Sequence, residues 1–408
     1  MEALLIKKII RLLGNVFIIP IYFLSILIPK NKNIWVFGSW FGMRYSDNSR
    51  YVFEHVLKHE KNLRPIWLSH NKSVIQLLRN KNFEAYPINS IKGFWYTCRA
   101  SAAIFSVNLS DINQLGSRKL LKVQLWHGIP LKKIVYDDNY ENIQKNKIVQ
   151  ILKKIKSLLF PFKEVIGSWD VVMSTSPLVS TIFKSAFRLE DDRIAVTGTP
   201  RADFLLCPSQ IHPIIFKETE SKEKQHLRIA YFPTHRNDSK ALIDFIYKIS
   251  VLENFLTDHN AVLYIKLHYY NLSHINPSLI QNSNIIILQE EDCPDINELL
   301  PFVDILITDY SSVYFDYLLL DRPMIFLPFD LKDYQAVNRE LYGDYNELTP
   351  GPKCYTWEEV MVQLEGLIRD HDNYIKIRTE FKHQYHTYQD TKNSQRVVDV
   401  VKQYINTQ

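Results

Sequence analysis

Residues 305–316 of this 408-residue chain read ILITDYSSVYFD. Four apolar or β-branched residues run directly into Asp309, and a helix-like pattern follows Ser312. We interpret the stretch as a buried strand that ends in small hydroxyl residues at the start of a helix. A helix N-terminus carries free N–H groups and a positive dipole end, so it attracts phosphate, and Ser311 and Ser312 add hydroxyl donors there. A plain N-cap is the alternative interpretation, since Asp and Ser are favoured caps.

The same alternation of apolar strands and helix-like stretches runs along most of the chain. The expected strands of the first half are 34–37, 65–68, 103–107, 123–126, 171–174 and 194–197. Those of the second half are 228–232, 261–267, 285–288, 305–308 and 324–327. Continuous apolar strands that alternate with helices predict parallel sheets covered on both faces. We therefore expect two doubly wound, Rossmann-type α/β domains, with a hinge near residues 200–213.

Composition excludes several classes of protein. A hydrophobic content of 46% is ample for real cores, and the net charge of +5 suits an anionic substrate or an anionic membrane face better than a nucleic acid. Glycine is scarce, and neither a GxGxxG fingerprint nor a Walker A loop is present. The four cysteines are far apart and lack metal-ligand spacing, so neither a zinc site nor a disulfide framework is indicated. A reducing cytoplasm is the simplest compartment.

The N-terminus contains an apolar run from residue 16 to 29, flanked by basic residues on both sides. The run is short for a bilayer span and contains Pro20, and no small-residue cleavage site follows it. We expect an interfacial anchor whose basic residues lie on anionic lipid. A signal anchor and a plain buried helix are the alternatives. A second basic stretch, residues 132–163, is either a solvated helix or an amphipathic surface for lipid or an anionic acceptor.

Polar clusters follow the expected strands. In open parallel sheets, ligands bind beyond the carboxyl ends of the strands, so residues there are candidates for a site. These clusters are His127-Gly128 with Lys132, residues 198–203, residues 233–236, Lys266 with His268, and residues 309–312. Arg236, Lys266 and the serines are types that bind phosphate, and a His is a natural general base for an acceptor hydroxyl. Each also has a structural interpretation: a hydrogen-bonding His, an interdomain turn at 199–201, an ion pair at Arg236, and a cap at Asp316.

The motifs together resemble the CDP-glycerol glycerophosphotransferase family, the teichoic acid and capsule alditol-phosphate primases and polymerases. The resemblance spans roughly residues 34–388 with the motifs in order. The residues that carry it are His127-Gly128, Lys132, Gly198-Thr199-Pro200-Arg201, Asp203, Pro233-Thr234, Arg236, Lys266, His268, Thr308 to Ser312, Phe315-Asp316 and Pro350-Gly351-Pro352. One departure is His235, where relatives often have an aromatic residue such as Trp.

The resemblance implies a GT-B-like pair of domains with a cleft between them, on the cytoplasmic face of the cell membrane. It implies transfer of glycerol phosphate or ribitol phosphate from CDP-glycerol or CDP-ribitol to a lipid-linked or polymeric acceptor, with release of CMP. By position, His127 matches the catalytic base, and Lys132 and Asp316 are supporting residues. The donor-binding residues are Thr199, Arg201, Thr234, Arg236, Lys266, His268, Asp309, Ser311 and Ser312.

The expected organisation has four parts. Residues 1–32 form a membrane-associating segment, 33–205 an acceptor domain, 206–385 a CDP-donor domain, and 386–408 a C-terminal helix. No metal is required by the sequence, although Mg²⁺ could support the reaction, and the oligomeric state is left open. Two other hypotheses remain at this point: a GT-B glycosyltransferase that uses a sugar nucleotide, and a membrane-associated binding protein without activity.

Overall fold

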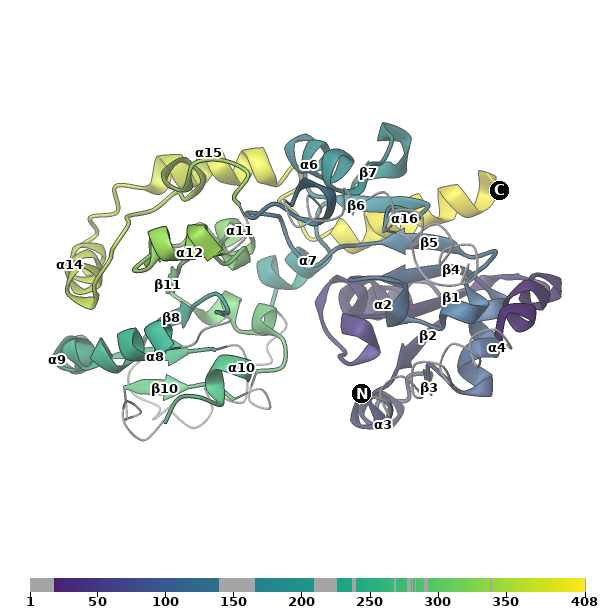
Figure 1. The fold of residues 1–408 in the computed structure, drawn as a ribbon, viewed down its shortest axis with the longest axis horizontal. Helices are drawn as coiled ribbons and strands as arrows, with labels where there is room; N and C mark the ends of the chain where they lie inside the picture. The colour runs from purple at the N-terminus through teal and green to yellow at the C-terminus, as the bar shows by residue number, and fades with distance from the viewer. Residues whose placement is uncertain are drawn as a thin grey trace, which may run out of the picture. The chain divides into compact units, whose positions relative to one another are not determined.

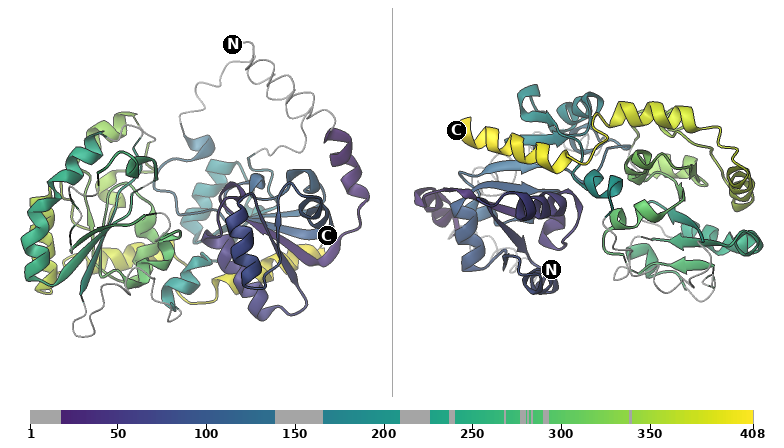
Figure 2. Two further views of the ribbon diagram at one scale, coloured as in Figure 1. Left: turned by 90° about the horizontal axis from the view of Figure 1, so that it is seen from below. Right: turned by 180° about the vertical axis from the view of Figure 1, so that it is seen from behind.

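The computed structural model describes residues 18–138, 166–208, 226–236, 240–267, 269–276, 280, 282, 284–289, 293–337 and 340–407. The chain forms two compact units. The first contains residues 1–127, 135–203 and 390–408, and the second contains residues 128–134 and 204–389. Figures 1 and 2 show that each unit is a sheet with helices packed against it.

The first unit is built on a seven-stranded sheet. Its strands are β1 (Asn31–Gly38), β2 (Arg64–Ser69), β3 (Ala85–Pro87), β4 (Ala100–Phe105), β5 (Leu121–Gln124), β6 (Val171–Ser174) and β7 (Ile194–Val196). They lie in the order β3-β2-β1-β4-β5-β6-β7, and every pair is parallel. The prediction of a parallel α/β sheet is confirmed. Strand β3 was missed, because three residues that end in a proline give too short an apolar pattern.

Helices flank this sheet along the chain. They are α2 (Asp47–His59), α3 (Lys72–Asn80), α4 (Ile91–Arg99), α6 (Pro177–Phe187) and, from the end of the chain, α16 (Asn393–Thr407). Helix α16 packs against α2 and against β4 and β5 (Figure 1). Its buried residues Val397, Val398 and Val401 join the same apolar core as Val52 and Phe53 of α2. Burial of such side chains contributes ~1.5–3 kcal/mol each, so α16 is an integral part of the first unit.

The second unit has a five-stranded parallel sheet in the order β10-β9-β8-β11-β12. The strands are β8 (Leu227–Phe232), β9 (Ala261–Ile265), β10 (Ile285–Ile287), β11 (Ile305–Thr308) and β12 (Met324–Phe326). The helices are α8 (Lys240–Ile246), α9 (Glu253–Asp258), α10 (Tyr269–Leu272), α11 (Val313–Tyr317), α12 (Leu331–Val337), α13 (Tyr345–Leu348), α14 (Trp357–Ile368) and α15 (Ile375–Tyr385). Side chains of α8, α9 and α14 form one core with the sheet.

The helix expected after Ser312 is shorter than the sequence pattern indicates. Helix α11 has five residues and passes into a 3₁₀ turn at Leu318–Leu320. All five of its side chains are buried, because this segment enters the core directly. The aligned-dipole argument for a phosphate site is therefore weak at this position, since few peptide units add to the dipole.

The boundaries of the units differ from those expected from the sequence. The final helix belongs to the first unit, and residues 128–134 belong to the second. The reason for the latter is a set of bonds to a distant segment. The backbone N–H of Lys133 donates to the carbonyl of Glu340 over 2.7 Å, and that of Tyr342 donates to the carbonyl of Leu131 over 3.1 Å.

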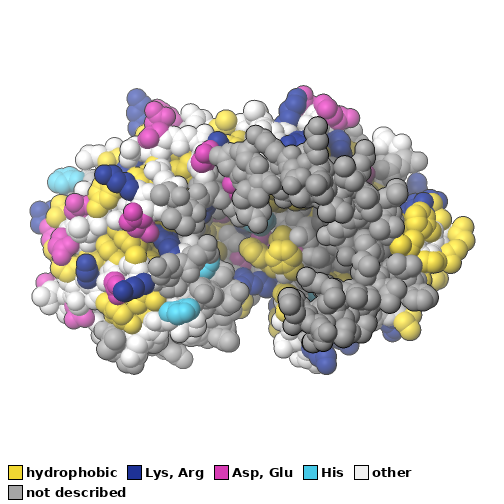
Figure 3. Space-filling view, in the orientation of Figure 1, with side chains coloured by type: hydrophobic (Ala, Val, Ile, Leu, Met, Phe, Trp, Pro, Cys, Tyr) yellow, Lys and Arg dark blue, Asp and Glu magenta, His cyan; other side chains and the backbone are white. Residues whose placement is uncertain are grey.

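The described part of the N-terminal segment is helical from residue 18 to 24 and ends in a 3₁₀ turn at Ser25–Leu27. It exposes large apolar side chains: Leu24 is 60% and Leu27 75% exposed. Figure 3 shows a hydrophobic patch beside Lys and Arg side chains at its right-hand edge, where Figure 1 draws this segment in purple. Among the helices that the structure describes, none has the length and hydropathy to cross a bilayer. Most of the basic stretch 132–163 lies outside the described residues.

Candidate active site

His127 follows β5 and is held against the end of β4. Its Nδ1 lies 3.2 Å from the backbone carbonyl oxygen of Ser106. Because a carbonyl oxygen can only accept, Nδ1 carries the hydrogen, and Nε2 is the basic nitrogen of the ring. The rings of Trp40 and Trp126 lie 5.5 Å and 4.4 Å from the imidazole. Trp126 has a φ of +56°, a strained value for a bulky residue that is typical of functional sites.

The segment that carries His127 is held by Arg201. The Arg201 guanidinium donates to the backbone carbonyl oxygen of His127 over 2.9 Å. The same group is ion-paired with Asp47 over 2.9 Å, and the two side chains are only 6% and 5% exposed. Breaking a buried ion pair of this kind strongly destabilises a protein, because one buried charge is then left without a partner. Because this buried ion pair holds Arg201, the position of His127 depends on the packing of the first unit.

Thr199 and Asn48 make a second connection to the same segment. The Thr199 hydroxyl and the backbone N–H of Arg201 both donate to the Asn48 side-chain oxygen, over 2.8 and 3.2 Å. The Asn48 amide in turn donates to the backbone carbonyl of Trp126 over 2.9 Å. The sequence indicated Thr199 and Arg201 as donor-binding residues. The structure instead places both side chains in buried bonds that support the segment 126–127.

The rest of this motif fastens the C-terminal helix. The Asp203 carboxylate accepts hydrogen bonds from the backbone N–H groups of Asn393 and Ser394, each over 2.8 Å, at the start of α16. Gly198 has a φ of +80°, and a Cβ there would lie 1.8 Å from the Asn393 side-chain oxygen. Only glycine fits this close approach. Residues 198–203 are thus the point at which α16, α2 and the His127 segment are joined.

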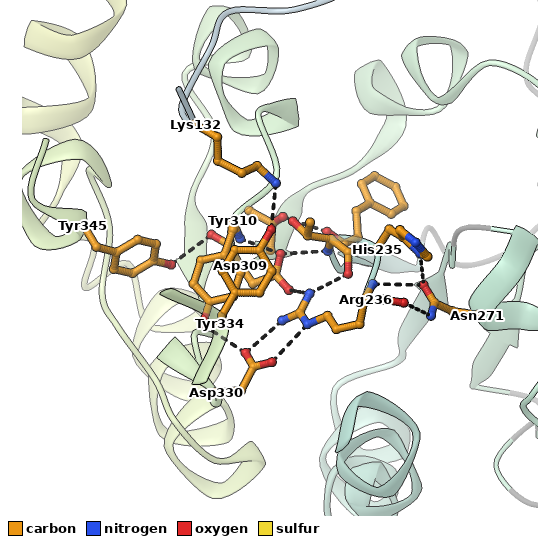
Figure 4. Close-up of polar contacts among 12 residues, drawn as sticks. Lys132, His235, Arg236, Asn271, Asp309, Tyr310, Asp330, Tyr334 and Tyr345 are labelled. Carbon is orange, nitrogen blue, oxygen red and sulfur yellow. Dashed lines mark hydrogen bonds and ion pairs between the residues drawn. The ribbon is translucent and has the colours of Figure 1, made fainter. Parts of the chain in front are cut away.

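In the second unit, Arg236 lies at the carboxyl end of β8 and is 4% exposed. Its guanidinium contacts Asp309 over 2.7 Å and forms a two-pronged pair with Asp330 over 2.9 and 3.0 Å (Figure 4). Burial opposes the charge, but the two carboxylates outweigh it and raise the pKa of Arg236. Asp309 also accepts from the backbone N–H of Thr234 over 2.8 Å. Asp330 accepts from the Tyr310 hydroxyl over 3.0 Å. The guanidinium of Arg236 is thus paired with carboxylates of the protein itself.

Aromatic rings surround this ion-pair network. The rings of Tyr310 and Tyr334 stack with centroids 3.9 Å apart. Lys132 donates to the Tyr334 hydroxyl over 2.9 Å, and the Tyr345 hydroxyl donates to the backbone carbonyl of Asp309 over 2.9 Å (Figure 4). Lys132 is therefore connected to the strand ends of the second unit, although it follows His127 closely in the sequence. Rigid rings around a desolvated ion pair fix the shape of this edge of the sheet.

His235 turns toward a buried amide. Its Nδ1 donates to the Asn271 side-chain oxygen over 2.9 Å, and the Asn271 amide donates to the backbone carbonyl of Arg236 over 3.0 Å. Asn271 is 1% exposed. The His at this position thus helps to order the turn after β8.

Lys266 directly follows β9, and its Nζ donates to the backbone carbonyl of Gln289 over 2.8 Å. Thr234 follows β8, and its buried hydroxyl has no hydrogen-bond partner among the residues that the structure describes. A buried hydroxyl without a partner costs free energy, which a ligand that bonds to it would recover. His268 lies outside the described residues.

Ser311 and Ser312 lie at the end of β11, and both are partly exposed. The Ser311 hydroxyl accepts weakly from the backbone N–H of Val313 over 3.4 Å, whereas Ser312 is the N-cap without a side-chain cap bond. The cap interpretation alone therefore accounts poorly for these hydroxyls. Asp316 is buried on α11 at 4% exposure.

A pocket of about 480 Å³ opens beside Trp126 in the first unit. Its lining is aromatic, aliphatic and neutral polar: Phe41, Val107, Asn108, Ser110, Gln114, Trp126, Val135, Ile166 and Trp169. None of the lining residues that the structure describes is charged, so this lining does not suit a phosphate. Among the described residues, no group of three or more His, Cys, Asp or Glu is arranged to hold a metal ion.

Several residues of these networks were not predicted from the sequence: Asp47, Asn48, Asp330, Tyr334 and Tyr345. Asp330 comes four residues after the end of β12, so the strand-end argument used for the other clusters could have found it. Asp47 and Asn48 begin a helix, where Asp and Asn are usual caps. Nothing in the sequence distinguishes them from ordinary capping residues.

Two parallel α/β sheets with polar residues at the carboxyl ends of their strands are the arrangement of GT-B-like transferases. The chain is matched over residues 20–403 by the family model for CDP-Glycerol:Poly(glycerophosphate) glycerophosphotransferase. It belongs to this family and is a transferase.

Individual relatives agree with this assignment. The chain is 29% identical over 381 residues to a teichoic acid glycerol-phosphate transferase of Staphylococcus aureus (strain NCTC 8325 / PS 47), covering 91% of this chain and 93% of that protein. It is 26% identical to a teichoic acid ribitol-phosphate primase of Bacillus spizizenii, covering 97% of both. A variant of the wall teichoic acid polymerase TagF soaked with CDPG is similar in structure, with a TM-score of 0.74 and 25% identity over 93% of this chain and 90% of that one.

Proposed function

We propose that this protein transfers glycerol phosphate from CDP-glycerol to a hydroxyl of a lipid-linked or polymeric acceptor in teichoic acid synthesis. His127 takes the proton of the acceptor hydroxyl, and the oxygen attacks the phosphorus that carries the glycerol. The bond between that phosphorus and the bridging oxygen breaks, and CMP leaves with the electron pair. The products are the acceptor extended by one glycerol phosphate, and CMP. The family match over residues 20–403 carries this proposal.

The geometry of His127 supports the role of base. Its Nδ1 donates to the carbonyl of Ser106, so the ring is held in the tautomer whose Nε2 can accept a proton. Thr199 and Arg201 support this arrangement through buried bonds. We propose that they act by holding the segment of His127.

On the donor side, we propose that Lys266, Ser311, Ser312 and the buried Thr234 hydroxyl contact the diphosphate, together with His268. A cation and hydroxyl donors at the strand ends would stabilise the charge that develops on the departing CMP. Arg236 has its guanidinium bonded to Asp309 and Asp330. We therefore propose that these three residues shape the donor site. Lys132 and Asp316 are supporting residues, because one is bonded to Tyr334 and the other is buried on α11.

The pocket beside Trp126 is our proposed site for the neutral part of the acceptor. Its aromatic and amide side chains suit a sugar ring, which packs on aromatic faces and bonds to amides. Phe41 is 51% exposed at this pocket, so Phe41→Ala removes a wall without opening the core. We expect a higher acceptor KM and an unchanged donor KM. An unchanged acceptor KM would remove the pocket from the proposal.

Ribitol phosphate is the second candidate for the transferred group, because the ribitol-phosphate primase is covered as fully as the glycerol-phosphate relatives. One assay separates the candidates. Purified protein is given CDP-glycerol, CDP-ribitol or UDP-sugars with a panel of lipid-linked acceptors, and nucleotide release and product mass are measured. We expect CMP release and a mass increase of one or more glycerol phosphates. UDP release alone would replace the proposal with a glycosyltransferase. The same assay with and without EDTA tests whether Mg²⁺ supports the reaction.

We also propose that the protein works at the cytoplasmic face of the membrane and is bound there peripherally by its N-terminal segment. Exposed Leu24 and Leu27 are the apolar side of this contact. Arg118 lies beside the segment, with its guanidinium 4.4 Å from the Phe23 ring centroid and a bond to the Phe23 carbonyl. Apolar side chains next to cations favour binding to anionic lipid.

A further inference from the structure

Asp111 is a fully buried carboxylate for which the reaction described above has no use. It lies in the loop after β4, in a 3₁₀ turn at Leu109–Asp111. One of its oxygens accepts from the backbone N–H of Phe41 over 2.6 Å. The other accepts from the N–H groups of Ser106 and Val107 over 3.1 and 2.9 Å. A single side chain thus joins two loops that are distant in the sequence.

The first of these loops is strained. Trp40, Phe41 and Gly42 are three consecutive residues with φ values of +48°, +57° and +72°. Such a conformation costs on the order of 1–3 kcal/mol for each non-glycine residue, and it persists only where the surroundings hold it. The bond from Phe41 to Asp111 holds the middle of this turn. The turn in turn places the Trp40 ring 5.5 Å from the imidazole of His127.

The second loop carries the hydrogen-bond partner of His127. The carbonyl oxygen of Ser106 accepts from Nδ1 of His127, and the N–H of the same Ser106 donates to Asp111. Trp40 and Ser106, which contact the imidazole ring from outside its own segment, are therefore tied to one carboxylate. A close approach confirms how tightly this region is packed: a Cβ on Gly38 would lie 1.9 Å from the Asp111 carbonyl.

We propose that Asp111 is a positioning residue for His127, which it orients and keeps in the Nδ1–H tautomer through the Trp40–Gly42 turn and Ser106. The inference rests on the proposed function insofar as His127 is the base. It adds that the base depends on a carboxylate that does not touch it. Displacement of a catalytic group by about 1 Å can cost roughly a hundredfold in rate, so the effect should be large.

The test uses Asp111→Asn in the full-length protein. An asparagine has one acceptor oxygen, so it can keep the bonds to Ser106 and Val107 but presents an NH₂ group to the N–H of Phe41. We expect a loss of roughly tenfold to a hundredfold in kcat for CMP release, with the donor KM unchanged. Trp40→Ala should likewise lower kcat and leave the donor KM unchanged. Because both act on the same ring, the double variant should lose little more than the worse single variant.

Two further measurements keep the inference separate from the proposed function. Trp95→Ala, at a Trp that is 44% exposed on α4, is the matched control and should retain full kcat. Histidine-selective ¹⁵N NMR, with the His127 signals assigned by their loss in His127→Gln, reports the tautomer without any substrate. We expect the Nδ1–H form in the wild type and a mixture of tautomers in Asp111→Asn.

The outcomes are distinct. If the wild type releases no CMP, the proposed function fails, while the NMR comparison still decides the role of Asp111. If Asp111→Asn folds and keeps its kcat and its imidazole signals, the inference is overturned. It is also overturned if the loss of kcat in the double variant equals the product of the losses in the two single variants. If Asp111→Asn does not fold, Trp40→Ala alone decides, because an unchanged kcat there breaks the proposed link to His127.

Discussion

Arg201 donates a hydrogen bond to the backbone carbonyl of His127 over 2.9 Å while the same guanidinium is ion-paired with Asp47. The proposed base is therefore held by a residue 74 positions later in the chain. This bond gives the Gly-Thr-Pro-Arg motif a physical role. It joins the segment of the proposed base to helix α2, and Asp203, two residues after Arg201, holds the start of α16. The position of His127 therefore depends on the packing of the first unit.

Replacement of Arg201 by Ala should destabilise the protein severely. Asp47 would be left buried without its partner, which costs about 3–5 kcal/mol. The thermal unfolding midpoint measures the loss. Lys184→Ala is the control, because the Lys184–Asp191 pair has side chains that are 45% and 83% exposed and contributes ~0–1 kcal/mol. Equal midpoints for the two variants would show that the buried pair does not hold this segment.

His127→Ala should abolish most of the reaction. Loss of a general base lowers kcat by roughly 10²- to 10⁴-fold, and donor binding should persist because the proposed donor residues lie in the second unit. CMP release and equilibrium binding of CDP-glycerol are measured side by side. His371→Ala, at an exposed position after α14, should retain activity. A folded His127→Ala protein with normal turnover would refute the assignment of the base.

Lys266→Ala should weaken donor binding. A charge-assisted bond to phosphate contributes about 1.5–3 kcal/mol, so we expect the donor KM to rise by more than tenfold. The acceptor KM is measured in the same experiment and should change little. Lys248→Ala removes an exposed lysine elsewhere in the same unit and controls for net charge. A rise in KM that is the same for both variants would point to a general electrostatic effect.

Leu24→Glu combined with Leu27→Glu should weaken binding to vesicles that contain anionic lipid. The change places charge on two side chains that are 60% and 75% exposed, so folding should be unaffected. Co-sedimentation with vesicles measures the bound fraction. Leu77→Glu on α3, where the leucine is 47% exposed, is the matched control. Binding that is lost in neither variant would place the membrane contact elsewhere.

Asp111 should make the stability of the protein depend on pH. Burial raises the pKa of Asp111 to about 7, although its backbone N–H partners oppose the shift. The folded state therefore holds a proton that the unfolded state releases between pH ~4 and ~7. The stabilisation from this group is full below pH ~4 and is lost as the pH rises toward 7. The Asp111→Asn variant lacks this titratable carboxyl group and therefore serves as the reference protein.

The thermal unfolding midpoint of the wild type, relative to that of Asp111→Asn, should thus fall as the pH is raised from 4 to 7. The contributions of titratable groups that both proteins share cancel in this comparison. Thermal unfolding at several pH values measures the difference between the two proteins. A difference that stays constant over this range would mean that Asp111 does not change its protonation on unfolding.

Local patterns predicted the strands well. Strands β6 and β11 were expected at their observed places, because short apolar runs between polar residues have few other structures available. Positions after strands could also be predicted as candidate sites, since parallel strands end at a common edge. His127, Lys266 and Ser311 were proposed as site residues in this way. Their contacts in the fold could not be predicted, because a contact joins segments that are far apart in the chain.

Arg236 illustrates the difference. Its type and its place after β8 predicted a phosphate ligand, and nothing local revealed that Asp309 and Asp330 pair with it. Similarly, the pattern of residues 394–405 predicted a helix, but the place of this helix in the first unit depends on Asp203 and on the valines that it buries. Helix α11 has only five residues, Val313 to Tyr317, and the sequence pattern did not reveal that all five are buried in the core.

The sequence by itself determined the α/β class, most of the strands, the likeness to a transferase family and the choice of His127 as the candidate base. Periodicity, strand ends and ordered motifs are properties of neighbouring residues, so they can be read along the chain. Only the tertiary structure decided which charged residues are available to a substrate and which are bonded to one another. Desolvation and pairing depend on what surrounds a side chain in space, and for Arg201, Arg236 and Asp111 those surroundings come from distant parts of the chain.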